Sequence, residues 1–387
     1  MTDDMPLGPD LVSPALLPAG LRDLLPPDAE TEALGVEALM GVFSSHGYER
    51  VKPPLLEFED SLLTGSGAAV AEQTFRLMDP GTHRMMGLRP DMTPQVARIA
   101  ATRLVNAPRP LRLSYTGACV QLGGGSLSSD RQVSQAGIEL IGPDSPEADA
   151  EVVAVGAEAL AALDIARISF DLTMPPLAPA LIEAAGLPET DRSPLLRALD
   201  RKDAAAVTRH GGSLAQVLSD LLLSAGPAAR ALSVLRAAPL TAAARRLSDR
   251  LEATVAAIEA RAPGIRLTVD PIEFRGWRYH TGVCVTVYAA GRPEELGRGG
   301  RYVSGNSEPA CGLTLRTEAL LRAAPARPSR LRLFLAPGAD PVAARRLRGD
   351  GFATVAALGP ATDAVAEARR LGCTHILRGD LPVPLES

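Results

Sequence analysis

Aromatic residues and lysines are scarce in this chain of 387 residues. Phe, Trp and Tyr together make up 3% of it, so the core has to be built mostly from Ala, Leu and Val. Lys52 and Lys202 are the only lysines, and the other basic residues are arginines. We attribute this richness in Ala, Arg, Gly and Pro to genomic base composition, and it indicates no particular function.

Long apolar runs are also missing, and we expect no secretory leader. No stretch reaches the roughly 18 apolar residues that a membrane span needs, and the first ten residues, MTDDMPLGPD, lack a basic segment followed by an apolar one. Four cysteines lie far apart without CxxC spacing, which predicts reduced, mostly buried thiols. They are Cys119, Cys284, Cys311 and Cys373. We therefore expect a cytoplasmic protein without a membrane partner.

An excess of positive charge is absent, because the formal net charge is −5. Proteins that hold RNA or DNA along a large face usually show a basic stripe, and none is visible here. We therefore expect that nucleic acid is not the main partner. The histidines show no metal-ligand spacing, so the sequence predicts neither a metal site nor a cofactor. They include His46, His83, His210 and His375.

The order of predicted elements indicates an α+β fold in two parts. Residues 1–325 form the larger part, in which two β-rich stretches at 110–122 and 131–142 predict long neighbouring strands. Residues 176–262 are rich in Ala, Leu and Arg with helical periodicity, which predicts a helical insertion. Residues 331–387 alternate strand and helix, and we expect them to form a small C-terminal α/β domain.

Three local predictions concern segments near the candidate site. Thr93 is expected to cap a helix that begins at Pro94 and runs to about Val105. The glycine-rich residues 297–302 are expected to form a turn, or a place where the backbone approaches a ligand closely. Residues 313–323 are expected to form a helix beneath the sheet.

Five segments of the chain carry a recognisable pattern. They are GLRDLLP at 20–26, LRPDMT at 88–93, RQVSQAGIE at 131–139, FRGWRYHTG at 274–282 and GRGGRY at 297–302. In this order and spacing they resemble the core of class II aminoacyl-tRNA synthetases of the histidyl type, over roughly residues 15–325. The resemblance implies an antiparallel sheet flanked by helices, and a dimer formed through residues 29–54.

The sequence departs from that family where ATP would bind. The resemblance places Gln121 and Ala319 at the positions of two family arginines, and Gly123 at the position of an acidic residue. Arg316 lies one helical turn before the position of the second arginine. Each charge-assisted hydrogen bond contributes roughly 1.5–3 kcal/mol, and arginine suits phosphate geometry. Losing two such arginines would cost several powers of ten in rate, so we expect no amino-acid activation.

The resemblance also implies a histidine-binding pocket. Its members would be Asp91, Thr93, Gln135, Glu139, Arg275 and Tyr279, with His280 in place of the family's second tyrosine. Asp91 and Gln135 would accept hydrogen bonds from the ammonium group of histidine, and Arg275 would bind its carboxylate. Glu139 would accept the ring N–H. His280 changes the wall of the ring pocket and puts its fine specificity in question.

Taken singly, several of these residues have a simpler structural explanation. Asp91 and Thr93 suit the start of a helix, whereas Glu139 suits the exposed face of a strand. Arg275 and Arg278 suit a solvated surface. The ligand role is preferred for Asp91, Thr93, Glu139 and Arg275 because the motifs occur together, and Arg278 is left as a surface charge.

The segment LRPDMTPQVAR at 88–98 is similar to the regulatory subunits of ATP phosphoribosyltransferase, which are paralogues of histidyl-tRNA synthetase. That resemblance implies a non-catalytic subunit in histidine biosynthesis. It also implies a short-form catalytic subunit as partner in a hetero-oligomer, with histidine as inhibitory effector. The alternatives are a divergent histidyl-tRNA synthetase and a stand-alone histidine-binding or tRNA-binding protein. The role of residues 331–387 is left open.

Overall fold

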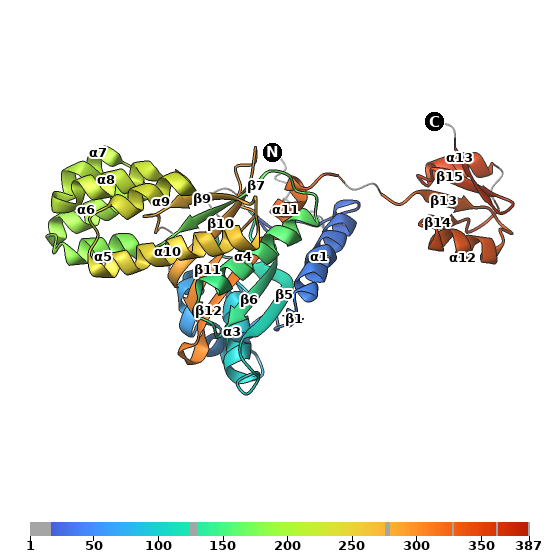
Figure 1. The fold of residues 1–387 in the computed structure, drawn as a ribbon. Coiled ribbons are helices and arrows are strands. Elements are labelled where there is room, and N and C mark those ends of the chain that lie inside the picture. Colours follow the sequence, from blue (N-terminus) through green and yellow to red (C-terminus); the bar gives the residue numbers. More distant parts are fainter. Residues whose placement is uncertain (1–16, 124–129, 275–278, 327–328, 361–362, 386–387) are drawn as a thin grey trace, which may run out of the picture. The chain divides into compact units, whose positions relative to one another are not determined.

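The computed structural model describes residues 17–123, 130–274, 279–326, 329–360 and 363–385. The chain divides into two compact units, Met1–Pro325 and Ala326–Ser387 (Figure 1). Among the helices described, none is both long enough and apolar enough to cross a membrane.

A nine-stranded sheet organises the first unit (Figure 1). In spatial order its strands are β1 (Glu49–Arg50), β5 (Leu111–Val120), β6 (Gln132–Ile141), β12 (Pro309–Arg316), β11 (Gly297–Val303), β10 (His280–Ala289), β7 (Ile168–Thr173), β9 (Arg266–Asp270) and β8 (Gly226–Pro227). Pairing is antiparallel from β5 to β7 and parallel at β1–β5 and β7–β9. The long strands predicted at 110–122 and 131–142 are confirmed as β5 and β6.

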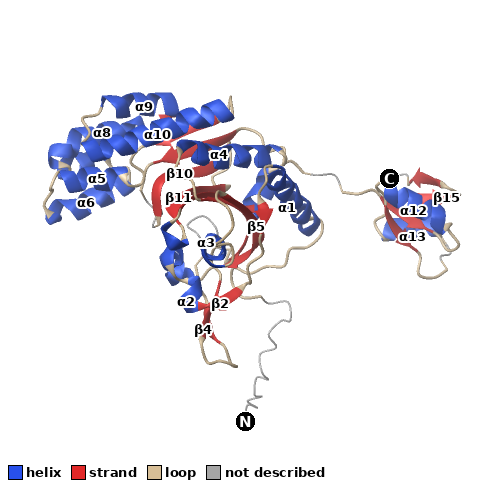
Figure 2. Ribbon diagram, turned by 60° about the horizontal axis from the view of Figure 1, so that its bottom comes forward, coloured by secondary structure: helices blue, strands red, loops and turns tan. Residues whose placement is uncertain are grey.

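Helices α1 (Asp28–Ser45), α4 (Pro146–Ala161) and α10 (Ala242–Arg261) pack against one face of this sheet (Figure 2). Ile138 and Leu313 point into the core on that face, since both are buried with apolar residues of α1 and α4. Strand residues alternate between faces, so their neighbours Glu139 and Thr314 lie on the other face.

The opposite face carries a smaller apolar cluster around α3 (Thr93–Thr102). Met92 and Val96 pack there against Tyr115 and Tyr302. A three-stranded sheet and short helices complete this side of the unit. They are β2 (Leu56–Phe58), β4 (Met85–Leu88), β3 (Arg76–Met78), α2 (Glu59–Leu62) and the 3-10 segments Gly65–Gln73 and Gly305–Ser307.

Residues 177–261 are mostly helical, as their periodicity predicts. The helices are α5 (Leu177–Ala184), α6 (Glu189–Asp200), α7 (Ala204–His210), α8 (Ala215–Ser224), α9 (Ala228–Ala237) and α10, with a 3-10 turn at Gly212–Leu214. The insertion also supplies the edge strand β8, which pairs with β9. This strand is not predicted from the sequence, because two residues are too short to show a period.

The turn predicted at 297–302 is wrong, because these residues form strand β11. A side chain at Gly299 would overlap the carbonyl of Gly312 on the neighbouring strand. Gly300 has a φ of +146°, and a Cβ there would be 2.7 Å from the Cα of Cys284. The glycines therefore permit close strand approach, and a side chain at either position would be excluded.

Two helix predictions also need correction. Only Thr317–Ala323 is helical (α11), whereas residues up to Arg316 continue β12. Leu313 and Leu315 share a buried face with a period of two, and this strand signal was taken for a helix. Thr93 does not cap α3: it is the first helical residue, and the helix ends at Thr102.

The second unit is built on a four-stranded sheet in the order β14 (Ala353–Ala356), β13 (Arg332–Leu335), β15 (His375–Arg378) and β16 (Leu381–Pro384). Helices α12 (Pro341–Gly349) and α13 (Ala364–Arg370) connect the parallel strands. The antiparallel strand β16 was not predicted. It contains Pro382 and Pro384, which an edge strand tolerates.

Candidate functional site

A cavity of about 700 Å³ opens on the α3 face of the large sheet. Six of the residues proposed for amino-acid binding line it: Asp91, Thr93, Gln135, Glu139, Tyr279 and His280. They come from the start of α3, from β6, and from the beginning of β10. The seventh, Arg275, lies outside the described residues.

Glu139 is the most heavily hydrogen-bonded group of this cavity. Its Oε1 accepts hydrogen bonds from Thr93 Oγ1 at 2.8 Å and from the Tyr115 hydroxyl at 3.2 Å. Its Oε2 accepts one from the Tyr302 hydroxyl at 2.9 Å. Burial raises the pKa of Glu139 to about 7, and the bonds from Thr93 and Tyr302 oppose that rise. The carboxyl group therefore titrates near neutral pH.

Two glycines make room for Glu139 and its partners. Gly312 lies directly opposite Glu139 in the β6–β12 pairing, and a Cβ there would overlap the Glu139 carboxylate. A Cβ at Gly137 would lie 2.5 Å from the Tyr115 hydroxyl. Larger residues at either position would push the carboxylate or the tyrosine ring out of place.

Asp91 and Gln135 place oxygen acceptors at the start of α3. Gln135 Oε1 accepts hydrogen bonds from the Met92 N–H at 3.2 Å and from Cys119 Sγ at 3.3 Å. Burial raises the pKa of Asp91, and the backbone N–H groups of Thr93 and Met92 oppose this rise. This end of the cavity offers carboxylate and amide oxygens, which suit a bound ammonium group.

Aromatic rings form another wall of the cavity. The rings of Tyr279 and His280 stack with centroids 4.3 Å apart and an interplanar angle of 26°. Tyr279 also meets the edge of Tyr302 at 6.0 Å. Burial, followed by the charge of Arg298, lowers the pKa of His280 to about 3. His280 is therefore a neutral ring at physiological pH, and this wall suits an uncharged or aromatic group.

Gln121 and Ala319 line the same cavity. The Gln121 amide donates to the carbonyl of Pro90 at 3.1 Å, so it is held by the segment before α3. Ala319 is buried in the first turns of α11. Neither side chain supplies a positive charge to the cavity.

Three arginines do line the cavity, and each has an acidic neighbour. Arg298 and Arg316 both form ion pairs with Glu295. Arg322 Nε lies 3.1 Å from Glu294 Oε1. The adjacent carboxylates therefore offset much of the positive charge that an incoming phosphate chain would meet.

Sequence motifs did not identify the tyrosine hydroxyl groups that hold Glu139. Tyr115 also shares a 2.7 Å hydrogen bond with Thr314 Oγ1 on β12. Tyr302 stands 163 residues after Glu139 in the chain, and no local period links residues that far apart. Its place in the GRGGRY segment was the one available signal. Within the described parts of the chain, no cluster of three or more His, Cys, Asp or Glu side chains is arranged to hold a metal ion.

Comparison with known proteins gives three results. The family model described as histidyl-tRNA synthetase matches residues 20–320. The ATP phosphoribosyltransferase regulatory subunit of Gluconobacter oxydans (strain 621H) is 58% identical and covers 98% of this chain and 100% of its own length. The protein of the same name from Paramagnetospirillum magneticum (strain AMB-1) is 51% identical over 96% of this chain and 98% of its own.

Solved structures show the same fold. An ATP phosphoribosyltransferase regulatory subunit/histidyl-tRNA synthetase from Bacillus halodurans superposes with a TM-score of 0.78 at 24% identity, covering 94% of this chain and 97% of its own. The histidyl-tRNA synthetase of Nostoc sp. PCC 7120 gives 0.77 at 17% identity, with coverage of 94% and 91%. The predicted α+β fold of class II synthetase type is thereby confirmed.

Proposed function

Because the chain belongs to the family of ATP phosphoribosyltransferase regulatory subunits, with a domain of histidyl-tRNA synthetase type, we propose that it activates a short-form catalytic subunit and confers inhibition by L-histidine. Its role in histidine biosynthesis is regulatory. The chain would act within a hetero-oligomer and would self-associate through residues 29–54, which include α1 and β1.

The observation that carries the proposal is the chemistry of the cavity lining. Asp91, Gln135 and Glu139 offer acceptors that match the hydrogen-bond donors of a histidine molecule. Gln121 and Ala319 add no positive charge, and the three arginines of the lining pair with Glu294 and Glu295. Such a cavity supports amino-acid binding without the fixed charges that ATP requires.

Histidine would be held by three groups of contacts. Its ammonium group would donate to Asp91 and Gln135, and its ring N–H to Glu139. Its carboxylate would pair with Arg275, a role that rests on the FRGWRYHTG motif alone. Such a site should bind histidine much more tightly than an analogue that lacks these donors. The analogue would leave the buried carboxylates without the hydrogen bonds that histidine donates.

Amino-acid activation is the competing function, since the matching family model is that of histidyl-tRNA synthetase. Attack on the α-phosphate needs positive donors aimed at the developing charge. Arg298 and Arg316 share Glu295, so they are poorly placed to supply that charge without losing their ion pairs. We therefore propose that the chain does not form an aminoacyl adenylate.

The test combines this protein with a short-form catalytic subunit from the same organism. Phosphoribosyl transfer to ATP is measured for the catalytic subunit alone, for the mixture, and for the mixture with L-histidine. We expect activity to require the mixture and to be inhibited by histidine. Histidine-dependent ATP–pyrophosphate exchange is measured in parallel on this protein alone. Robust exchange, or no effect on the transferase, would refute the proposal.

A further inference from the structure

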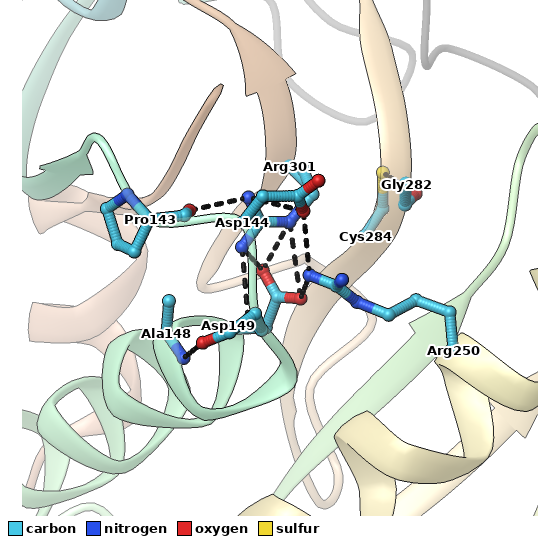
Figure 3. Close-up of polar contacts among 9 residues, drawn as sticks. Pro143, Asp144, Ala148, Asp149, Arg250, Gly282, Cys284 and Arg301 are labelled. Carbon is cyan, nitrogen blue, oxygen red and sulfur yellow. Dashed lines mark hydrogen bonds and ion pairs between the residues drawn. The ribbon is translucent and has the colours of Figure 1, made fainter. Parts of the chain in front are cut away.

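A polar network links strand β11 to helices α4 and α10 (Figure 3). We call it the Arg301 network, and it consists of Arg301 on β11, Asp149 on α4, Arg250 on α10 and Asp144 before α4. Arg301 donates to Asp149 Oδ1 from Nε at 3.0 Å and from Nη2 at 2.7 Å. Their side chains are 7% and 6% exposed. A buried, bidentate pair of this kind fixes the position of both residues.

Arg301 also fixes the turn that precedes α4. Its Nη1 donates to the carbonyl of Pro143 at 3.0 Å, and its Nη2 to that of Ser145 at 3.3 Å. Ser145 in turn caps α4 by accepting a hydrogen bond from the Ala148 N–H. One side chain of β11 thus holds the start of the helix that covers the sheet.

Arg250 connects the helical insertion to the same carboxylate. Its Nη2 lies 3.2 Å from Asp149 Oδ2 and 3.1 Å from Asp144 Oδ1. Asp149 is therefore shared: Oδ1 accepts from Arg301 on β11, and Oδ2 accepts from Arg250 on α10 and, at 3.3 Å, from Arg301 Nε. Figure 3 shows the two guanidinium groups meeting this carboxylate. A cavity of about 470 Å³, lined by Arg250 and Arg301 among others, borders the contact.

The network reaches the amino-acid cavity through the residues beside Arg301. Tyr302 follows it on the strand, points to the other face, and donates to Glu139. The aliphatic part of Arg301 packs over Gly282, where a Cβ would be 3.1 Å from Cδ. Gly282 lies in the irregular part of β10, between the paired residues His280 and Cys284. Arg301 therefore links two strands that supply cavity residues, β11 with Tyr302 and β10 with His280.

We propose that Arg301 is a positioning residue for the amino-acid cavity, and that Arg250 couples the occupancy of this cavity to helix α10 of the insertion. The inference rests on the proposed function, because it takes L-histidine as the ligand. A ligand that binds Glu139 changes the restraint on Tyr302 and on the neighbouring Arg301. Through the shared Asp149, that change alters how firmly Arg250 holds α10. Thermodynamic coupling is reciprocal, so restraint on α10 also alters histidine affinity.

The first test measures hydrogen exchange of the full chain with and without saturating L-histidine. We expect histidine to slow amide exchange in α10 by about fivefold in the wild-type protein. Arg250→Gln is expected to abolish this slowing, while calorimetry still detects histidine binding. Arg236→Gln is the matched control, because Arg236 also pairs with α10, through Glu252 at 2.7 Å, but is not part of the network. The control is expected to behave as the wild type.

The second test measures histidine affinity of Arg301→Lys, which keeps the charge and loses the bidentate contact. We expect its Kd for histidine to rise by about tenfold, with the pH dependence of binding unchanged. Should this variant fail to fold, the exchange test on Arg250→Gln still decides. Histidine binding without any response of α10, or an equal response in Arg250→Gln, overturns the coupling alone. An absence of histidine binding to the wild-type chain overturns the proposed function together with it.

Discussion

Glu139 combines full burial with three hydroxyl donors, and the balance between these effects sets its charge. Burial raises its pKa to about 7, although Thr93 and Tyr302 donate to it. A carboxyl whose folded pKa exceeds its unfolded value adds stability below the unfolded pKa, near 4.5. It loses that contribution as pH rises through 7. Histidine affinity should change with pH in the opposite direction. It should increase as the pH rises, because the ring N–H donates to the ionised carboxylate.

The first prediction concerns the pH dependence of histidine binding. With a pKa of about 7, the ionised fraction of Glu139 falls about eightfold between pH 7.5 and pH 6. The wild-type Kd is therefore expected to rise about eightfold more over this range than that of Glu139→Gln. Calorimetric titrations of both proteins measure this, and the titration of free histidine cancels in the comparison. Equal pH profiles would show that Glu139 is not the ring acceptor.

The second prediction concerns the space beside Glu139. Gly312→Ala places a methyl group on the Glu139 carboxylate and 2.7 Å from the Ile138 carbonyl. We expect its free energy of unfolding to fall by about 1–3 kcal/mol and histidine binding to weaken. Gly41→Ala is the control, because Gly41 lies in α1 and a Cβ there would meet no neighbouring atom within 4 Å. That control is expected to gain about 0.5–1 kcal/mol. Denaturant titrations compare the two, and an undisturbed Gly312→Ala would contradict the packing described.

At the scale of elements, prediction from sequence succeeded where a single period dominates. Strands β5 and β6 and the helices of the insertion show such periods and were found. Strand β11 was missed because Gly297, Gly299 and Gly300 suggest a turn. These glycines allow close approach to strands β10 and β12. That role depends on residues outside the glycine-rich segment, so the segment alone does not reveal it. Strand β16 was missed because its prolines disfavour a central strand but not an edge.

Only those residues of the candidate site that belong to sequence motifs were predicted. Asp91, Thr93, Gln135 and Glu139 came from the resemblance, and the structure brings them to one cavity. The tyrosines that hold Glu139, and the pair of Arg301 with Asp149, join residues far apart in the chain. Such contacts follow from sheet order, which composition and local spacing do not contain.

The third prediction concerns the element that leads into the FRGWRYHTG segment. Lys202, after α6, pairs with Asp270 at 2.6 Å and with Glu273 at 2.9 Å. Lys202→Met leaves these carboxylates facing each other without their cation. We expect a loss of about 1 kcal/mol in unfolding free energy and weaker histidine binding. Arg236→Met, whose pair with Glu252 is more exposed, should lose less than about 0.5 kcal/mol.

Urea titrations at low and high salt measure this difference. It should shrink at about 1 M salt, where charges are screened within about 3 Å. If both variants lose the same free energy, Lys202 acts as an ordinary surface charge. Unchanged histidine binding in Lys202→Met would show that this anchor does not support the pocket.

At the scale of the whole first unit, sheet order separates the proposed roles. The cavity strands β6, β12, β11 and β10 occupy the middle of the sheet. Strand β1, in the segment proposed for self-association, forms one edge, and the insertion supplies β8 at the other. A ligand in the middle can therefore influence both edges through continuous strands and through α10. This arrangement suits a sensor whose output is a change at an interface.

The central claim is that this cavity senses histidine for the catalytic partner. The most direct measurement titrates L-histidine into the reconstituted transferase, made with either the wild-type chain or Glu139→Gln. Activity of each complex is expressed relative to its own value without histidine, so that the comparison isolates the response to histidine. The concentration for half-inhibition should rise at least about tenfold in the Glu139→Gln complex, since a charge-assisted hydrogen bond is lost. Equal inhibition of the two complexes would contradict the account and place the inhibitory histidine elsewhere.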